Sequence, residues 1–386
     1  MNNDLHSATA LLSHAEEELP RGANDLRSFI QSLADTGRLL RVMDTVDWRF
    51  EIGRITRENR SPLLFEHVKD YPTHRVFTNG LCDSASIALA LGLPSGIKRK
   101  ALMTVVRKRV TNLFHPILVE TGPVLENIFP KEEASFLNLP IPHWSQLDVD
   151  RYVGTWHVNV SRDPETGVRN VGVYRMQLLG PRNATISASP GSHLAKHVAK
   201  SEREGRALPV AVAIGVAEAV IIAAAAAFPE GMDEYELAGG LLQQPIPLIR
   251  CKTVNLEVPA NSEIVIEGLI QPGVRVKDGP YLDYTGKSNV NPNAFLIEVT
   301  QIMFRSNPIY RGASIGVQGA EDHQLFAFLA ELDLIDFHGS QTKQLIQKGL
   351  LKQRLFRTFQ FTGRIGEIVR GKRGSSSYPD SQVDCT

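Results

Sequence analysis

Residues 156–189, WHVNVSRDPETGVRNVGVYRMQLLGPRNATISAS, decide the fold. Three strand-like runs in this stretch are separated by the short turn signals ETG and PRN, and similar runs follow at NSEIVIEGLI, NAFLIEVTQIMF and PIYRGASI. Strands joined by such short turns pair in antiparallel fashion. The pattern therefore predicts an antiparallel barrel or sandwich, interrupted by two helices.

The two helices follow from a long apolar segment and from a capping pattern. Residues 210–228 approach membrane-spanning length, but they include Glu218 and change from β-branched residues to alanine. This composition favours a buried strand followed by a core helix, with no transmembrane helix. Asp233 and Glu236 form a D-x-x-E variant of the capping box, which predicts that the second helix begins there.

Helical and strand patterns alternate in residues 25–110, which is typical of a small α/β layer. The expected fold class is α+β. Five segments are predicted: a flexible N-terminus (1–24), an N-terminal α/β domain (25–130), a central β-barrel that binds the cofactor (131–320), a partial C-terminal helical segment (321–370) and a disordered tail (371–386).

Charge and cysteine content exclude several classes of function. Lys+Arg and Asp+Glu both number 42, so the net charge gives no argument for binding nucleic acid or an anionic membrane. The three cysteines lie far apart and form no CxxC pair, so neither a disulfide framework nor a zinc knuckle is indicated. The N-terminus lacks a secretory pattern, and we expect a cytoplasmic protein with reduced thiols.

The strand-like run RNVGVYRMQ contains a carboxamide at Asn170 and a guanidinium at Arg175. Burying either group without partners costs several kcal/mol. The two residues are five apart, so a regular strand would point them to opposite faces. A bulge at Gly172, or a strand that begins after Asn170, would bring them together. The simpler alternative is a turn residue and a surface cation.

Two further polar residues begin helices. His193 follows the loop SASPGS, where a cap or surface role is the common one, and its pair with His197 lacks the acidic neighbour of a zinc site. Glu234 would compensate the dipole of the helix after Asp233. Alternatively, Asn170, His193 and Glu234 would together suit Mn²⁺ or Mg²⁺ bridging to a phosphate.

The run VKDGPYLDYTG places Asp278 and Asp283 around a Gly279–Pro280 turn. Two acids near a cation can hold different protonation states, as an acid/base pair requires. A solvated hairpin turn is the plain alternative.

These blocks together resemble the UbiD family of prenylated-flavin-dependent decarboxylases, which includes the ferulic acid decarboxylases. The resemblance runs from about residue 25 to about residue 320 and is strongest in RNVGVYRMQ, PVAVAIG, IRCKTVNLEVPANSEIVIEGLI and DGPYLDYTG. It implies a central split β-barrel of the flavin reductase type with inserted helices, followed by a C-terminal α/β domain that is incomplete here.

The resemblance also implies roles for individual residues. Asn170, His193 and Glu234 match the family's ligands for Mn²⁺, which couples the flavin phosphate to the protein, with K⁺ nearby. Arg175 and Asp283 match the catalytic arginine and the proton donor. The expected cofactor contacts are Asn170, Gly172, Val173, Tyr174, Arg175, Ser192, His193 and Glu234.

The implied function is the non-oxidative, reversible decarboxylation of an aromatic or α,β-unsaturated carboxylic acid, with prenylated FMN as the electron sink. Arg175 would hold the carboxylate, and Asp283 would protonate the carbon that loses CO₂. The implied partners are a small carboxylic acid substrate, a flavin prenyltransferase that supplies the cofactor, and a second copy in a homodimer. Neither nucleic acid nor a membrane is expected.

Two departures from the family pattern leave an alternative open. The first catalytic acid, usually Glu, is Asp278 here, and Leu282 stands where Gly is common. The C-terminal region is also shorter than expected. The alternative is a truncated or catalytically impaired relative that binds flavin phosphate or a partner without turnover. A flavin reductase acting with NAD(P)H is disfavoured, because the chain has no glycine-rich dinucleotide motif.

Overall fold

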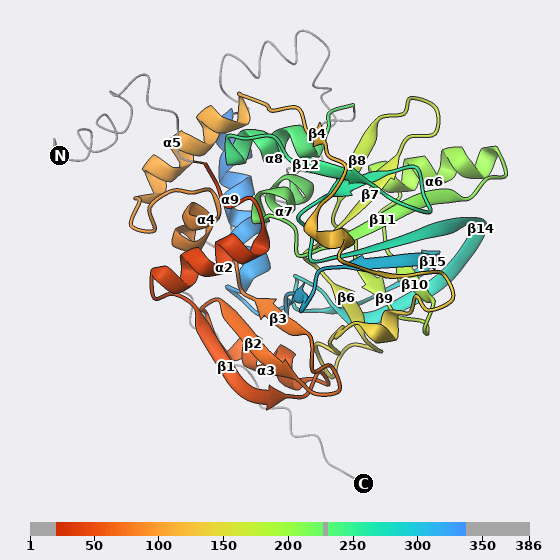
Figure 1. The fold of residues 1–386 in the computed structure, drawn as a ribbon, viewed down its shortest axis with the longest axis horizontal. Coiled ribbons are helices and arrows are strands. Elements are labelled where there is room, and N and C mark those ends of the chain that lie inside the picture. Colours follow the sequence, from red (N-terminus) through yellow and green to blue (C-terminus); the bar gives the residue numbers. More distant parts are fainter. Residues whose placement is uncertain (1–20, 227–230, 337–386) are drawn as a thin grey trace.

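The computed structural model describes residues 21–226 and 231–336, and Figure 1 shows a mixed α+β fold. A small four-stranded sheet lies at the lower left of the view and a larger curled sheet at the right, with helices grouped above and between them. The predicted C-terminal segment lies within the described residues only as far as residue 336. Residues 1–20 and the predicted tail lie outside them.

The smaller sheet has the strand order β1-β2-β3-β16. Its strands are β1 (Leu40–Val46), β2 (Leu63–Val68), β3 (Arg75–Thr78) and β16 (Ile309–Arg311). The run PIYRGASI was expected among the barrel strands, but its strand β16 pairs in parallel with β3 instead. Four helices accompany this sheet in the chain: α2 (Leu26–Asp35), α3 (Glu51–Glu58), α4 (Ser84–Ala90) and α5 (Arg99–Val110).

The larger sheet has the order β10-β15-β14-β11-β7-β8, and β5 also pairs with β15. Its strands are β5 (Asn127–Phe129), β7 (His157–Arg162), β8 (Arg169–Gly172), β10 (Asn183–Ile186), β11 (Leu208–Ile214), β14 (Ile264–Leu282) and β15 (Ser288–Phe304). Its pairs are antiparallel. The prediction of an antiparallel sheet is therefore confirmed, and the long β14–β15 hairpin forms its centre.

Short elements complete the fold. A three-stranded sheet contains β13 (Glu257–Pro259), β12 (Pro247–Arg250) and β4 (Ile117–Leu118), and β6 (Tyr152–Gly154) pairs with β9 (Met176–Gln177). The single-turn helices are η1 (Pro123–Leu125) and η2 (Phe136–Asn138), and the later helices are α6 (His193–Arg203), α7 (Glu218–Ala225), α8 (Glu234–Leu242) and α9 (Glu321–Asp336).

The structure tests both helix predictions. Residues 208–225 form the buried strand β11 and the buried helix α7, as predicted, and within the described ranges we find no helix with the length and apolar character to cross a membrane. Asp233 caps α8 by accepting a hydrogen bond from the Tyr235 N–H. The predicted capping box is wrong, because Glu236 instead contacts His115 Nδ1 at 2.6 Å.

A buried ion triad connects the smaller sheet to the helices. The Arg311 guanidinium on β16 donates to Glu218 of α7 at 2.7 Å and also pairs with Glu321 of α9. Arg311 and Glu218 are 0% exposed. Because a buried charge is stable only when it is paired, this triad fixes α7 and α9 relative to β16, beside the pocket described next.

Candidate active site

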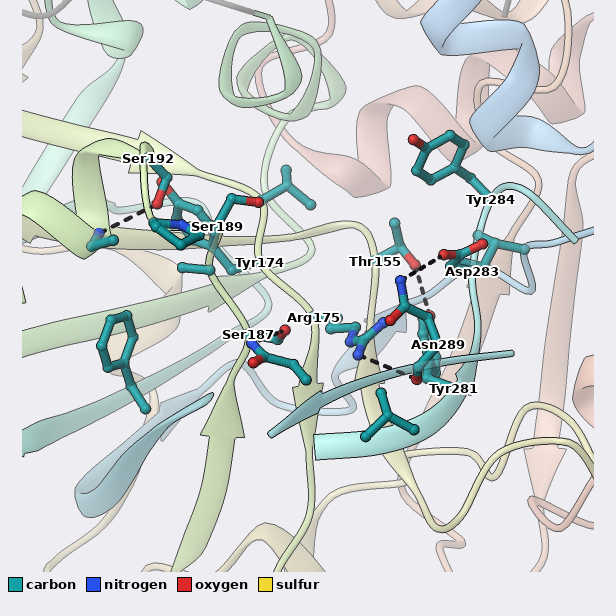
Figure 2. Close-up of a pocket in the computed structure, with 18 of the residues that line it drawn as sticks. Thr155, Tyr174, Arg175, Ser187, Ser189, Ser192, Tyr281, Asp283, Tyr284 and Asn289 are labelled. Carbon is teal, nitrogen blue, oxygen red and sulfur yellow. Dashed lines mark hydrogen bonds between the residues drawn. The ribbon is translucent and has the colours of Figure 1, made fainter. Parts of the chain in front are cut away.

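A pocket of about 870 Å³ opens beside the larger sheet. Figure 2 shows its polar side chains in two groups, with Ser189, Ser192 and Tyr174 at one end and Asp283, Asn289 and Tyr281 at the other. Arg175 lies between them. We call the first group the loop end and the second the acid end. The volume lies within the range of roughly 300–1,000 Å³ that is usual for cofactor and ligand sites.

The segment from Asn170 to Arg175 is not one continuous strand. β8 pairs regularly with β7 through Gly172, and the ladder is then interrupted at Val173 and Tyr174. Arg175 resumes pairing through an isolated bridge with Ser187. Neither of the two expected arrangements, a bulge at Gly172 or a strand that begins after Asn170, is present, because Asn170 and Gly172 both pair regularly within β8. The interruption after Gly172 removes the strict alternation of a strand and frees Arg175 to face the pocket.

Two of the predicted metal ligands, Asn170 and Glu234, lie near Tyr174. Asn170 is buried on β8. The residue after it, Val171, donates its backbone N–H to Glu234 Oε2 at 2.9 Å. Burial raises the pKa of Glu234 to about 8, against the lowering effect of that N–H. Burial likewise raises the pKa of the Tyr174 hydroxyl, and polar groups of Asn170 and Ser192 offset part of the shift.

His193 is half-buried at the first position of α6, directly after Ser192, which caps the helix by accepting from Ala195 N–H. The preceding loop, residues 187–190, lines the pocket together with Ser192. A helix N-terminus carries unpaired N–H groups and partial positive charge, which favour an anion such as phosphate. The loop end of the pocket thus has the chemistry of an anion site.

Asp278 holds Arg175 at the acid end. The Asp278 side chain is 0% exposed, and its Oδ1 accepts from Arg175 Nε at 2.7 Å, while Oδ2 accepts from the Thr185 hydroxyl. The Arg175 guanidinium also lies over the Tyr281 ring, 5.2 Å from its centroid. The structure therefore brings together the predicted pair of Arg175 and the first acid, with the acid behind the arginine.

The turn predicted at Gly279–Pro280 is wrong, because both residues lie within β14. Asp283 lies in the turn that follows, between β14 and β15. Its Oδ1 accepts from the N–H and hydroxyl of Thr285, and its Oδ2 accepts from Asn289 Nδ2 at 3.3 Å. The backbone carbonyl of Asn289 in turn accepts a long hydrogen bond, 3.5 Å, from Arg175 Nη2. Asn289, which the sequence did not suggest, therefore connects the arginine to the second acid.

Aromatic side chains form another wall of the pocket. The rings of Trp156 and Tyr284 both meet Phe326 of α9 edge to face, with centroids 6.4 Å and 5.7 Å apart. Such a wall suits a flat, apolar group. Sequence periodicity gave no sign of it, because Trp156 and Phe326 are 170 positions apart and meet only in the fold.

The His197 side chain contacts a serine hydroxyl and is not arranged as a zinc ligand. Its buried Nδ1 lies 2.9 Å from the Ser161 hydroxyl of β7. Within residues 21–226 and 231–336, no three histidine, cysteine, aspartate or glutamate side chains gather as a metal site. The set of Asn170, His193 and Glu234 has only two members of those types, because its third side chain is a carboxamide.

Comparison with known proteins identifies the family. Residues 30–105 match the N-terminal domain and residues 117–318 the Rift-related domain of 3-octaprenyl-4-hydroxybenzoate carboxy-lyase, UbiD. The chain belongs to the UbiD family. The resemblance inferred from the sequence blocks is thereby confirmed.

Two named decarboxylases are similar to most of the chain. The chain is 31% identical to pyrrole-2-carboxylic acid decarboxylase of Pseudomonas aeruginosa over 82% of its length, and 30% identical to phenolic acid decarboxylase of Bacillus subtilis over 77%. It spans 66% and 65% of those two proteins, just under two thirds of each.

Solved structures of the UbiD class share the fold. An evolved dimeric form of HmfF from Pelotomaculum thermopropionicum in complex with prFMN gives a TM-score of 0.75 at 36% identity, covering 81% of this chain and 72% of that one. Vanillic acid decarboxylase of Sedimentibacter hydroxybenzoicus in its closed form gives 0.76 at 28% identity, with coverages of 80% and 67%.

Proposed function

We propose that this protein is a non-oxidative, reversible decarboxylase of an aromatic or α,β-unsaturated carboxylic acid that uses prenylated FMN. The observation that carries the proposal is a single pocket with Arg175, held by a buried acid, between an anion-binding loop and Asp283. Membership of the UbiD family supports it, as do the names of the related pyrrole-2-carboxylic and phenolic acid decarboxylases.

The loop end fits the phosphate of the flavin and a divalent metal. Asn170 is buried; its amide oxygen is the atom that would bind a metal, and its amide nitrogen is a donor that would suit the phosphate. Glu234 is a buried carboxylate that a cation would stabilise. We propose that Asn170, His193 and Glu234 hold Mn²⁺, with K⁺ nearby, and that the N-terminus of α6 meets the phosphate.

Arg175 would bind the substrate carboxylate. Its contacts to Asp278 and Asn289 use Nε and Nη2, so Nη1 still has hydrogens to donate. Asp278 neutralises the guanidinium from behind and keeps it in one orientation. The substrate's ring or double bond would lie against the wall of Trp156 and Phe326, which also reduces access of water.

Asp283 would deliver the proton that replaces CO₂. Loss of CO₂ leaves an electron pair that no ordinary side chain accepts, and prenylated FMN supplies the electron sink when it is bound. Thr285 and Asn289 hold the two oxygens of the Asp283 carboxyl in place. These contacts position the carboxyl beside the pocket, and one of its oxygens would have to gain a proton in place of an accepted hydrogen bond before Asp283 acts as the donor.

The remaining parts of the proposal concern the whole protein. We propose that the curled sheet is a split β-barrel of the flavin reductase type, within the domain boundaries given above. We also propose a cytoplasmic homodimer supplied by a flavin prenyltransferase. The dimeric state named for HmfF supports the dimer, and the free thiols of Cys82 and Cys251 agree with a reducing compartment.

The test is to produce the protein with and without a flavin prenyltransferase and to measure flavin absorbance, Mn content and CO₂ release. Pyrrole-2-carboxylate, cinnamate and phenolic acids would be the first substrates. We expect turnover only with the prenylated flavin, and exchange of labelled bicarbonate into the acid for the reverse direction. A protein that takes up no flavin and releases no CO₂ would refute the proposal.

A further inference from the structure

The peptide between Tyr174 and Arg175 is held by two buried side chains of the neighbouring strand. The Tyr174 carbonyl oxygen accepts from His157 Nε2 at 2.8 Å and, more weakly, from Asn159 Nδ2 at 3.4 Å. Both side chains belong to residues of β7 that are 0% exposed. They are two positions apart, so they lie on the same face of the strand.

This carbonyl needs side-chain partners because the ladder is interrupted there. Val173 and Tyr174 belong to neither β8 nor β9, so β-sheet pairing does not satisfy their backbone groups. Buried carbonyl groups in native proteins are nearly always hydrogen-bonded. His157 and Asn159 therefore replace the missing ladder bond at this one position.

The same peptide separates the two ends of the pocket. The Tyr174 ring folds back over Gly172, where an added Cβ would lie only 2.7 Å from the ring, and its hydroxyl is near Ser192 at the loop end. Arg175, the next residue, extends to Asp278 at the acid end. The planar peptide joins the Tyr174 carbonyl to the N and Cα of Arg175, so a fixed carbonyl also fixes the position of the backbone atoms from which the Arg175 side chain extends.

We propose that His157 and Asn159 are positioning residues that set the orientation of Arg175 for catalysis. We call this pair the Tyr174 clamp. This role rests on the decarboxylase function proposed above. The contact with the carbonyl requires the His157 tautomer with hydrogen on Nε2. Burial lowers the pKa of His157 to about 4, which agrees with a neutral ring at neutral pH.

His157→Phe keeps the ring volume and removes the donor, whereas His157→Gln keeps a donor nearby. We expect His157→Phe to retain flavin uptake and to lower kcat by about 10- to 100-fold, because displacing a reacting group by about 1 Å costs up to roughly 100-fold. KM should change much less, and His157→Gln should recover most of the loss. Asn159→Leu tests the second donor and replaces His157→Phe if that variant does not fold.

Ser161→Ala is the matched control. Ser161 is also 0% exposed and lies on the same face of β7, but its hydroxyl contacts His197 rather than Tyr174. We expect its kcat to stay within about twofold of wild type, since the hydroxyl that is removed contacts neither Tyr174 nor Arg175. A loss as large as that of His157→Phe would show a general effect of the strand and would overturn the clamp.

Hydrogen exchange of residues 173–177, followed by mass spectrometry, gives a readout that does not depend on turnover. We expect faster exchange in His157→Phe and Asn159→Leu than in wild type or Ser161→Ala. Wild-type exchange in both clamp variants would overturn the proposal. A wild-type protein without flavin uptake or CO₂ release would instead refute the decarboxylase function, and faster exchange in the variants would still support the clamp as a structural feature.

Discussion

Substitution of Asp148 should make the stability of the protein less dependent on pH. Asp148 is buried at 5% exposure, and its Oδ1 accepts a hydrogen bond from the N–H of Leu282. Leu282 is the residue before Asp283. Asp148 Oδ2 is buried without a hydrogen-bond partner in the described residues. Burial raises the pKa of Asp148 from 3.8 to about 6, although the Leu282 N–H lowers it in part.

The direction and size of the pH dependence of stability follow from the raised pKa of Asp148. A carboxyl with a raised pKa contributes stability that is fully present below pH 3.8 and is lost as the pH rises through about 6. The full shift corresponds to about 3 kcal/mol. Asp148→Asn keeps an oxygen for Leu282 and cannot ionise, but its amide nitrogen would replace an unpaired oxygen at a cost of about 1 kcal/mol. We therefore expect Asp148→Asn to be about 2 kcal/mol more stable than wild type at pH 8.

Urea unfolding between pH 4 and pH 8 measures the effect. The advantage of Asp148→Asn should grow by about 2 kcal/mol over this range, most of it below pH 6. Asp148→Ala, which also removes the acceptor for Leu282, separates the charge from the hydrogen bond and should slow turnover by displacing Asp283. A difference between wild type and Asp148→Asn that stays constant with pH would refute the reasoning.

Three further predictions concern the site and its support. Asp283→Asn should keep the flavin absorbance but stop product protonation, and full activity would show that the acid is assigned wrongly. Asn170→Ala and Glu234→Ala should each lower Mn and flavin retention, measured by metal analysis and absorbance, and unchanged retention would exclude them as ligands. Arg311→Ala should lower the free energy of unfolding by about 3–5 kcal/mol, because it leaves two buried carboxylates unpaired, whereas a loss below about 1 kcal/mol in urea unfolding would contradict a structural role for the triad.

Local patterns predicted the antiparallel sheet and most of its strands, because alternation and short turns are properties of neighbouring residues. The same patterns failed for β16. Its residues have the apolar, β-branched character of any buried strand, and only the fold determines that they pair with β3 rather than with the barrel strands. Pairing across more than 200 positions leaves no local signal in a single sequence.

The contacts in the site were likewise predicted only in part from the sequence. Arg175 and Asp278 were predicted together, and the structure pairs them. Asn289 and Thr185 were missed, because an asparagine or threonine in a polar hairpin or strand has no sequence pattern that distinguishes a partner of a catalytic acid from a surface residue. The two arrangements expected for Asn170 and Arg175, a bulge at Gly172 or a strand that begins after Asn170, were both wrong, because an interrupted strand changes the alternation of side chains in the same way.

Buried polar groups in this fold are of two kinds, and the difference points to function. Glu263 and Glu267 are 0% exposed and are fully paired: Arg27 holds the first, and backbone N–H groups of residues 252–254 hold the second. By contrast, His157, Asn159 and Asn170 on β7 and β8 each keep a polar atom without a hydrogen-bond partner among the described residues. Full pairing is what stability alone requires, since an unpaired buried group costs about 1–3 kcal/mol. Three of the half-paired residues lie on the strands that flank Tyr174 and Arg175, where orienting a side chain and binding a ligand give a reason to retain them, whereas others, such as Asp148 and Tyr235, lie elsewhere in the fold.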